Sequence, residues 1–369
     1  MMQLIFFAVS VLVLLGGYFL AWLAITKFFN INTFEGKIIT ASFVIIIFVS
    51  ILLSSFLIHK WDNLFTRWYY IFSAFWIGVL VNFGLMLFIV SIWKLVGPSL
   101  GLSPNAIQIK SLLIIGTIIL SFFGLFNAFV PKVKDYEVKI KDLPTAWHDK
   151  EIIQISDVHL GPVYRKNFFS RIIKKINNLK PEAVFITGDL FDGMEADFTW
   201  MNHPFSKLET KQGIYYAFGN HDLYLGFNYV HELLKESSVI ILDNKMVTKD
   251  GLQLIGINYS FNHDFNLHEA ILNQVGYSEN LPSILLYHEP KHIESAIKAG
   301  IDLQLSGHTH RGQLFPFNWL ANIMYKGYGY GLFEKDNFSL ITNSGLGTWG
   351  PPMRTSSRSE IVRIILRPL

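Results

Sequence analysis

The chain has 369 residues, of which 51% are hydrophobic and only 16% are charged. Its formal net charge of +3 argues against a nucleic-acid partner, because nucleic-acid-binding domains usually carry a clustered basic patch. The absence of cysteine excludes disulfides, thiolate-bound zinc, iron–sulfur clusters and a cysteine nucleophile.

The first third of the chain holds most of the apolar excess. Four stretches lack charged residues and reach roughly the 20 residues that a helix needs to cross a bilayer: residues 4–25, 38–58, 68–93 and 111–130. Tryptophan and tyrosine near their ends are typical of membrane interfaces. We therefore expect residues 1–131 to form a transmembrane region of four spanning helices, with Asn82 hydrogen-bonded to a neighbouring helix.

Four spans place both ends of the chain on one side of the membrane. The first stretch is expected to be retained rather than cleaved, because no basic residue precedes it and no small-residue cleavage site follows it. The side with both ends carries the larger number of nearby basic residues, so the positive-inside rule favours a multi-pass protein of the cell membrane with a cytoplasmic catalytic region. The residues counted on that side are Lys60, Arg67, Lys132, Lys134, Lys139 and Lys141, against Lys27, Lys37, Lys94 and Lys110 on the other.

The remaining chain reads as one α/β domain. Residues 132–149 are expected to be a linker with a first strand at 136–140, and residues 150–369 alternate strand patterns with helical ones. Helices are predicted at 168–179, 230–235, 268–274 and 293–299. Strands are predicted at 152–156, 183–187, 214–218, 239–242, 253–258, 283–287, 303–306, 338–342 and 361–366.

Five of these strands are followed by residues of the types that commonly bind metals in proteins. Because the carboxyl ends of strands in α/β proteins meet at one rim of a sheet, we expect these side chains to converge. Carboxylate, amide and imidazole ligands suit borderline divalent metals, and two adjacent metals are a device for splitting phosphate esters. The motifs are Asp157-Val158-His159, Gly188-Asp189, Gly219-Asn220-His221-Asp222, His288 and Gly307-His308-Thr309-His310.

One further group of polar residues repeats the same letters. Asn262-His263-Asp264 lacks a preceding glycine and is separated from the strand at 253–258 by a polar segment. We expect it to be a loop outside the metal site.

The motifs together resemble the calcineurin-like metallophosphoesterase superfamily, whose pattern is Asp-x-His, Gly-Asp, Gly-Asn-His-Asp/Glu, His and Gly-His-x-His. The resemblance covers about residues 135–369, and every position of the pattern is present. The neighbouring residues are similar to a bacterial membrane-associated branch of the YaeI/YkuE type, at Gln154–Asp157, Thr187–Leu190, Leu305–His310, Gly345–Thr348 and Pro351–Arg354.

The resemblance implies a fold and a set of roles. The fold is a four-layer sandwich of two mixed β-sheets flanked by helices. The implied cofactors are two divalent metal ions, manganese, iron or zinc. Asp157, His159 and His310 would hold the first ion, Asn220, His288 and His308 the second, and Asp189 would bridge them. His221 would be a catalytic acid oriented by Asp222.

Substrate and alternatives stay open at this point. Arg311 replaces the glycine common after Gly-His-Thr-His, and its guanidinium either clamps a phosphate or lies in solvent. The substrate is a phosphodiester, pyrophosphate or phosphomonoester, and it is expected to be lipid-linked because the anchor places the site near a bilayer. The resemblance to bacterial relatives makes UDP-diacylglucosamine one candidate, and phospholipids and soluble nucleotides stay open. The alternatives are a non-catalytic membrane sensor or scaffold, and a transporter, which the uncharged spans disfavour.

Overall fold

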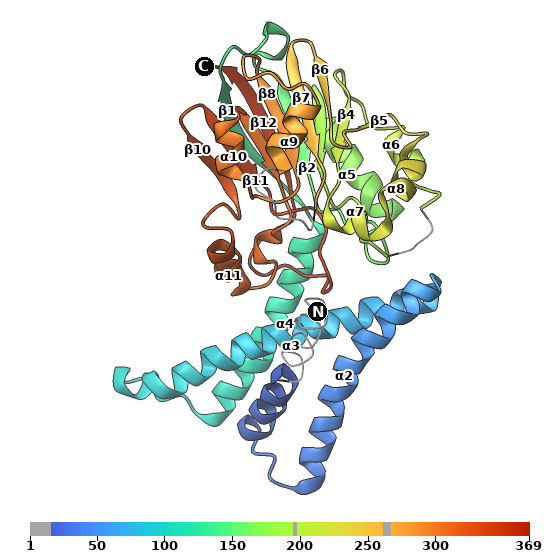
Figure 1. Cartoon of the computed structure of the whole chain (residues 1–369). Helices are drawn as coiled ribbons and strands as arrows, with labels where there is room; N and C mark the ends of the chain where they lie inside the picture. The colour runs from blue at the N-terminus through green and yellow to red at the C-terminus, as the bar shows by residue number, and fades with distance from the viewer. Residues whose placement is uncertain (1–15, 195–197, 261–266) are drawn as a thin grey trace. The chain divides into compact units, whose positions relative to one another are not determined.

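The computed structural model describes residues 16–194, 198–260 and 267–369. The chain divides into two compact units, residues 1–123 and residues 124–369, whose elements are labelled in Figure 1. The expected loop Asn262-His263-Asp264 and most of the first predicted span lie outside the described residues. The limits expected for the transmembrane and phosphoesterase regions stay a prediction.

Long apolar helices make up the first unit. The described part of the first predicted span, residues 16–25, is helical, and this helix continues to residue 28. The next helices are α2 (Phe34–Lys60), α3 (Leu64–Val96) with the short η1 (Gly97–Leu100), and α4 (Ala106–Phe129). Helices α2, α3 with η1, and α4 are each long and apolar enough to cross a membrane, which supports a membrane association.

Polar residues fix the ends and one contact of these helices. Helices α2, α3 and α4 each begin before the predicted apolar stretch. At the start of α3, the Asn63 side chain accepts hydrogen bonds from the first turn. Asn82 Nδ2 donates to Ser121 Oγ at 3.1 Å. The predicted hydrogen bond between helices is thus confirmed.

Two six-stranded mixed sheets form the centre of the second unit. In the first, β2 to β5 run parallel and β12 is antiparallel to β2. In the second, β7, β8, β9 and β11 run parallel and the antiparallel strands β6 and β10 lie at the edges. The first sheet has the order β1 (Lys132–Ile140), β12 (Glu360–Pro368), β2 (Glu151–Ile155), β3 (Ala183–Thr187), β4 (Ile214–Ala217), β5 (Val239–Ile241). The second has the order β10 (Gly331–Lys335), β11 (Phe338–Thr342), β9 (Leu303–Ser306), β8 (Ser283–Tyr287), β7 (Leu252–Ile257), β6 (Lys245–Lys249).

Alternation of side chains along the strands builds four layers. In β2, Ile152 belongs to the core between the two sheets, whereas Ile153 and Ile155 face the cluster that includes the apolar side of α5 (Lys166–Asn178). On the other side, Leu285 and Tyr287 of β8 pack with α9 (Leu267–Gln274) and α10 (Ile293–Lys298), the pair seen beside the second sheet in Figure 1. The predicted α/β sandwich of two mixed sheets flanked by helices is confirmed.

Several elements differ from the prediction. Strand β1 begins at Lys132 and so is longer than the expected strand at 136–140. Strands β6 and β10 are not among the predicted ones, because they are half-exposed edge strands with lysine at their ends. The predicted helix at 230–235 corresponds to α8 (Phe227–Leu234). The other helices of this unit that were not predicted are short: η2 (Thr145–Trp147), α6 (Asn202–Phe205), α7 (Asn220–Leu225), η3 (His310–Gly312) and α11 (Phe317–Met324).

Candidate metal centre

The residues of the expected site meet at one rim between the two sheets. Asp157 and His159 follow β2, Asp189 follows β3, His288 follows β8, and His308 and His310 follow β9. Asn220 and His221 form the first turn of α7, which begins after β4. Three overlapping groups of histidine and aspartate side chains have ligand atoms within 4.8 Å of one another. Strands from both sheets therefore contribute to one cluster.

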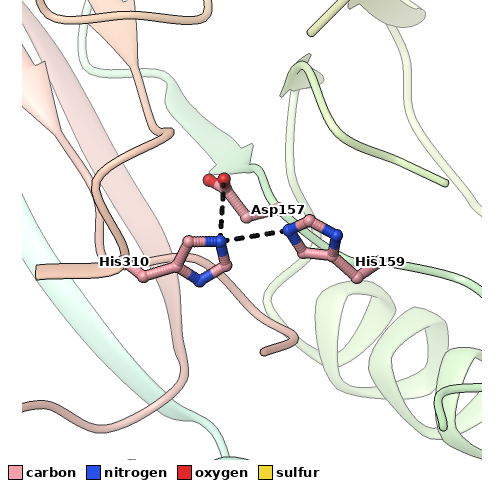
Figure 2. Close-up of side chains that lie close together, drawn as sticks. All are labelled: Asp157, His159 and His310. Atoms are coloured by element: carbon pink, nitrogen blue, oxygen red, sulfur yellow. Dashed lines mark hydrogen bonds and ion pairs between the residues drawn. The ribbon is translucent and has the colours of Figure 1, made fainter. Parts of the chain in front are cut away.

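The first group consists of Asp157, His159 and His310, whose side chains converge in Figure 2. His310 Nε2 lies 3.4 Å from Asp157 Oδ1 and 3.0 Å from His159 Nε2. All three side chains are buried. Two ring nitrogens and one carboxylate oxygen thus face a common point.

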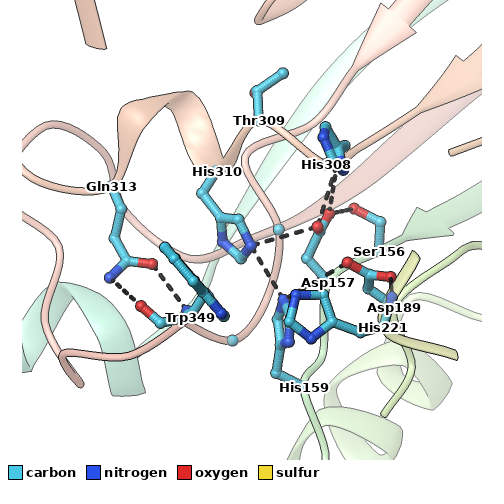
Figure 3. Close-up of polar contacts among 12 residues, drawn as sticks. Ser156, Asp157, His159, Asp189, His221, His308, Thr309, His310, Gln313 and Trp349 are labelled. Atoms are coloured by element: carbon cyan, nitrogen blue, oxygen red, sulfur yellow. Dashed lines mark hydrogen bonds and ion pairs between the residues drawn. The ribbon is translucent and has the colours of Figure 1, made fainter. Parts of the chain in front are cut away.

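The second group consists of Asp189, His288 and His308. His288 Nε2 lies 3.1 Å from Asp189 Oδ2 and 3.0 Å from His308 Nδ1. The same Asp189 Oδ2 lies 4.0 Å from His159 Nε2 of the first group. Asp189 is therefore the residue between the two groups, as Figure 3 shows for its position beside His159 and His221.

Hydrogen bonds on the far side of two rings set their tautomers. His288 Nδ1 lies 2.8 Å from the carbonyl oxygen of Thr187, and His159 Nδ1 lies 3.1 Å from Asp192 Oδ1. Because these oxygens accept, each ring donates its Nδ1–H there and turns Nε2 into the cluster. Metal-binding histidines are commonly held in this way.

The pKa values of the paired histidines are shifted in opposite directions. Burial would lower the pKa of His288, but Asp189 outweighs it and raises that pKa to about 10. Burial and the neighbouring His288 lower the pKa of His308 to about 4. Burial would also lower the pKa of His159, but Asp192 outweighs it and raises that pKa. Burial and the neighbouring His159 lower the pKa of His310. In each close pair the pKa of one ring is therefore raised and that of its neighbour lowered, and a divalent ion between the two facing nitrogens would contact both.

Asn220 offers an oxygen without a hydrogen-bond partner. Its side chain is buried, with 7% exposed, and its Oδ1 accepts no hydrogen bond within the described structure. A buried amide oxygen without a partner is costly. The donor set around it fits a divalent ion, which would supply the missing partner.

The backbone of the site is held in an uncommon conformation. Five of the clustered residues have positive φ, from 47° to 69°, in the left-handed region: Asp157, His159, Asp189, His308 and His310. Each such residue costs about 1–3 kcal/mol, and such residues concentrate at functional sites. The sequence pattern gives no sign of this strain.

Two glycines allow the strand ends to approach one another. A Cβ on Gly219 would lie 2.6 Å from the backbone nitrogen of Asp189, and one on Gly307 would lie 2.6 Å from Ser156 Cβ. Both distances are shorter than real Cβ contacts. Only glycine fits where these segments pass the cluster.

His221 and Asp222 differ from the expected arrangement. The His221 ring donates its Nδ1–H to the carbonyl oxygen of Asp192 at 2.9 Å. Asp222 instead accepts from the backbone nitrogens of Gly219 at 2.7 Å and Asp189 at 2.8 Å. Asp222 thus holds two strand ends together, and the main chain of Asp192, rather than Asp222, orients the His221 ring.

Three further residues support the cluster and were not among the site residues that the motif analysis named. Asp192 and Glu289 follow expected ligands closely in the chain, and Glu289 Oε1 lies 3.4 Å from His308 Nε2. Arg354 is fully buried, and its Nη2 donates to His310 Nδ1 at 3.1 Å. A second carboxylate soon after Asp189 was a usable signal for Asp192, whereas Arg354 is too far from His310 in the chain.

Arg311 lies beside the cluster on an aromatic ring. Its guanidinium carbon lies 4.1 Å from the centre of the Tyr330 ring, a cation–π contact. The structure therefore gives this half-buried arginine an aromatic partner, and its contact with a phosphate stays a prediction.

Comparisons with known proteins agree with this geometry. The chain matches the model of the family described as calcineurin-like phosphoesterase over residues 150–312. A metallophosphoesterase of Campylobacter jejuni is 32% identical over 324 residues, covering 85% of each chain. A transmembrane protein with metallophosphoesterase domain of Danio rerio is 31% identical over 332 residues, covering 82% of this chain and 74% of that one. The metallophosphoesterase YkuE of Bacillus subtilis is 27% identical over 249 residues, covering 63% of this chain and 84% of that one. The chain therefore belongs to the calcineurin-like metallophosphoesterase family.

Proposed function

We propose that the protein is a membrane-anchored phosphoesterase that hydrolyses its substrate with two divalent metal ions. The observation that carries this proposal is the position of Asp189, whose Oδ2 faces His288 Nε2 at 3.1 Å and His159 Nε2 at 4.0 Å. One carboxylate thereby belongs to two adjacent groups of ligands, which suits a pair of ions rather than a single one.

The ligands divide between two positions. Asp157, His159 and His310 would hold one ion, whereas Asn220, His288 and His308 would hold the other. Asp189 would contact both. When bound, the pair would supply Lewis-acid activation of a water nucleophile and neutralise charge on the phosphoryl oxygens. Carboxylate, amide and imidazole donors suit manganese, iron and zinc alike.

His221 is the proposed proton donor. Its Nδ1–H is committed to the carbonyl oxygen of Asp192, so Nε2 is the nitrogen left to exchange a proton with the leaving oxygen. The ring is partly exposed and stands at 85° to the His159 ring, with 4.7 Å between ring centres. Such a group contributes a rate factor of about 10²–10⁴. Asp222 acts as a positioning residue through the backbone of Asp189.

The substrate is proposed to be a lipid-linked phosphodiester or pyrophosphate, with UDP-diacylglucosamine as one candidate. The apolar helices of the first unit support this choice, as does the relative described as a transmembrane protein. Arg311 is a candidate contact for the phosphate group, because it lies one residue after His310. We further propose that the protein spans the cell membrane several times, with its phosphoesterase domain in the cytoplasm. A protease-accessibility assay on a tag at Leu369 would test this orientation.

Hydrolysis by the purified full-length protein tests the proposal. A chromogenic phosphodiester and the matching phosphomonoester are each assayed with added manganese and with EDTA, beside the Asp157→Asn variant. We expect metal-dependent cleavage of the diester that EDTA and the variant abolish. Two bound metals without cleavage of either compound or of any lipid-linked phosphoester would instead indicate a sensor that retains the fold.

A further inference from the structure

Helix α11 leaves its apolar side chains uncovered. Among its eight residues, none is buried, and Trp319, Ile323 and Met324 are 62%, 74% and 66% exposed. Phe317 and Leu320 are also exposed. Contiguous apolar side chains of this kind mark an interaction surface.

The helix is amphipathic and its surroundings are basic. At about 100° per residue, Asn318 and Asn322 fall on one side of the helix and the large apolar side chains on the other. No acidic residue occurs between positions 311 and 333, whereas Arg311 and Lys326 are basic. Apolar and basic residues without acidic ones are typical of helices that lie in a membrane interface.

The end of α4 lies on the loop that also holds the start of α11. The last residues of α4, from Gly124 onward, belong to the second unit. The Gly124 carbonyl oxygen accepts from the Arg354 backbone nitrogen at 2.9 Å, and the Asn127 carbonyl oxygen accepts from the Ser359 nitrogen at 2.9 Å. Residues 354–359 are therefore fixed to the end of a helix that is apolar and long enough to cross a membrane.

The same loop contacts the chain just before α11. Gln313 Nε2 donates to the carbonyl oxygens of Trp349 and Pro351 at 3.0 Å each, and the Phe315 nitrogen donates to Thr355 Oγ1 at 2.9 Å. Trp349 itself is 63% exposed. A membrane helix thus ends on the loop that carries Trp349 and holds the first residues before α11.

A cation marks the end of α4 as well. Arg358 lies over the Phe126 ring, with its guanidinium carbon 4.9 Å from the ring centre, and its Nε donates to the Val130 carbonyl oxygen at 2.7 Å. Arginine at the end of an apolar helix is common at membrane interfaces, where its charge reaches the headgroups.

We propose that α11 and Trp349 form a docking surface that inserts into the interface of the lipid bilayer. The occupant is the membrane because the loop joining this surface to α4 brings the end of a proposed membrane span to it. The basic residues Arg311 and Lys326 add attraction to anionic headgroups. The surface stands independently of the hydrolytic activity, since it needs neither metal nor substrate.

Docking would bring the metal centre close to the headgroups. Tyr325, which directly follows α11 as its C-cap, donates from its hydroxyl to Glu289 Oε1 at 3.4 Å. Its ring centre lies 6.0 Å from that of His308. The helix that inserts is therefore adjacent to a proposed metal ligand.

Lipid quenching of a single label tests the docking surface. The chain has no cysteine, so Ile323→Cys gives one site for an environment-sensitive fluorophore in the full-length protein. The labelled protein is placed in nanodiscs of phosphatidylcholine and phosphatidylglycerol, with or without nitroxide-labelled lipid. Leu281→Cys is the matched control, because Leu281 is also apolar and 46% exposed but precedes β8, at the opposite end from the metal ligands.

We expect several-fold stronger quenching at position 323 than at position 281. A Met324→Cys label should behave in the same way, which guards against a local defect in one variant. Equal, weak quenching at all three positions would overturn the proposal. A label at 323 that is shielded from water but not quenched by lipid would also overturn it, since a protein partner would then cover α11.

Discussion

Substitution of Gly219 by alanine tests whether the strand ends must approach as closely as the structure shows. The new Cβ would lie 2.6 Å from the Asp189 backbone nitrogen and 2.9 Å from Asp189 Cγ. Ordinary contacts begin near 3.4 Å, so the end of β3 must shift by several tenths of an ångström. The shift strains the hydrogen bonds that tie Asp189 to His221 and Asp222.

The expected cost is that of overpacking a dense interior, about 1–3 kcal/mol. For a unit of this size such a loss lowers Tm by about 2–12 °C. Because the shift displaces the carboxylate of Asp189, Gly219→Ala should also bind less metal per chain. Differential scanning calorimetry and elemental analysis of the purified full-length protein measure the two effects.

Gly329→Ala provides the matched control. A Cβ there would meet its nearest atom, the carbonyl oxygen of Ala321, at an ordinary 3.4 Å. This variant should keep the Tm and the metal content of the unmodified protein. If Gly219→Ala also keeps both, the close approach of β3 and α7 is not what shapes the metal site.

Substitutions at three other positions have distinct expected outcomes. Asn220→Ala should lower metal content in elemental analysis, because it removes the buried oxygen without a partner, and Asn220→Asp should restore part of it. His221→Ala should reduce kcat by about 10²–10⁴-fold with metal content unchanged, and a loss of metal would show that His221 is a ligand instead. Burial raises the pKa of Asp302 to about 6, although hydrogen bonds from Ser283 lower it. As pH falls, the folded protein therefore binds a proton at Asp302 at a higher pH than the unfolded chain does. Its contribution to stability is present below pH about 4 and lost as pH rises through about 6, so Asp302→Asn should flatten the dependence of Tm on pH between these values.

The ligands were accessible from the sequence because each follows a strand. Asp157, Asp189 and His288 come directly after buried apolar segments, and the topology of parallel strands brings such positions to one rim. The position of each ligand after a strand was therefore enough to predict that the cluster converges. The long helices followed from uncharged apolar stretches of sufficient length, whereas the arrangement of two facing sheets followed from the resemblance to the family.

Long-range partners were not accessible in the same way. Arg354 reaches His310 across 44 residues, and a lone arginine in a loop gives no indication that it is buried. The contact of His221 with the Asp192 main chain depends on backbone geometry, which residue types do not encode. Helix α11 was not predicted from the sequence. A helix is recognised by apolar residues that recur on the face packed against the core, and none of the eight residues of α11 is buried.

Metal titration of the full-length protein tests the central claim most directly. Protein stripped with EDTA is titrated with manganese while bound ions per chain and phosphodiester hydrolysis are followed together, beside the Asp189→Asn variant. The account predicts two ions per chain, hydrolysis that rises with the second ion, and reduced binding of both ions in the variant. Hydrolysis by the stripped protein, or full occupancy and activity in Asp189→Asn, would contradict it.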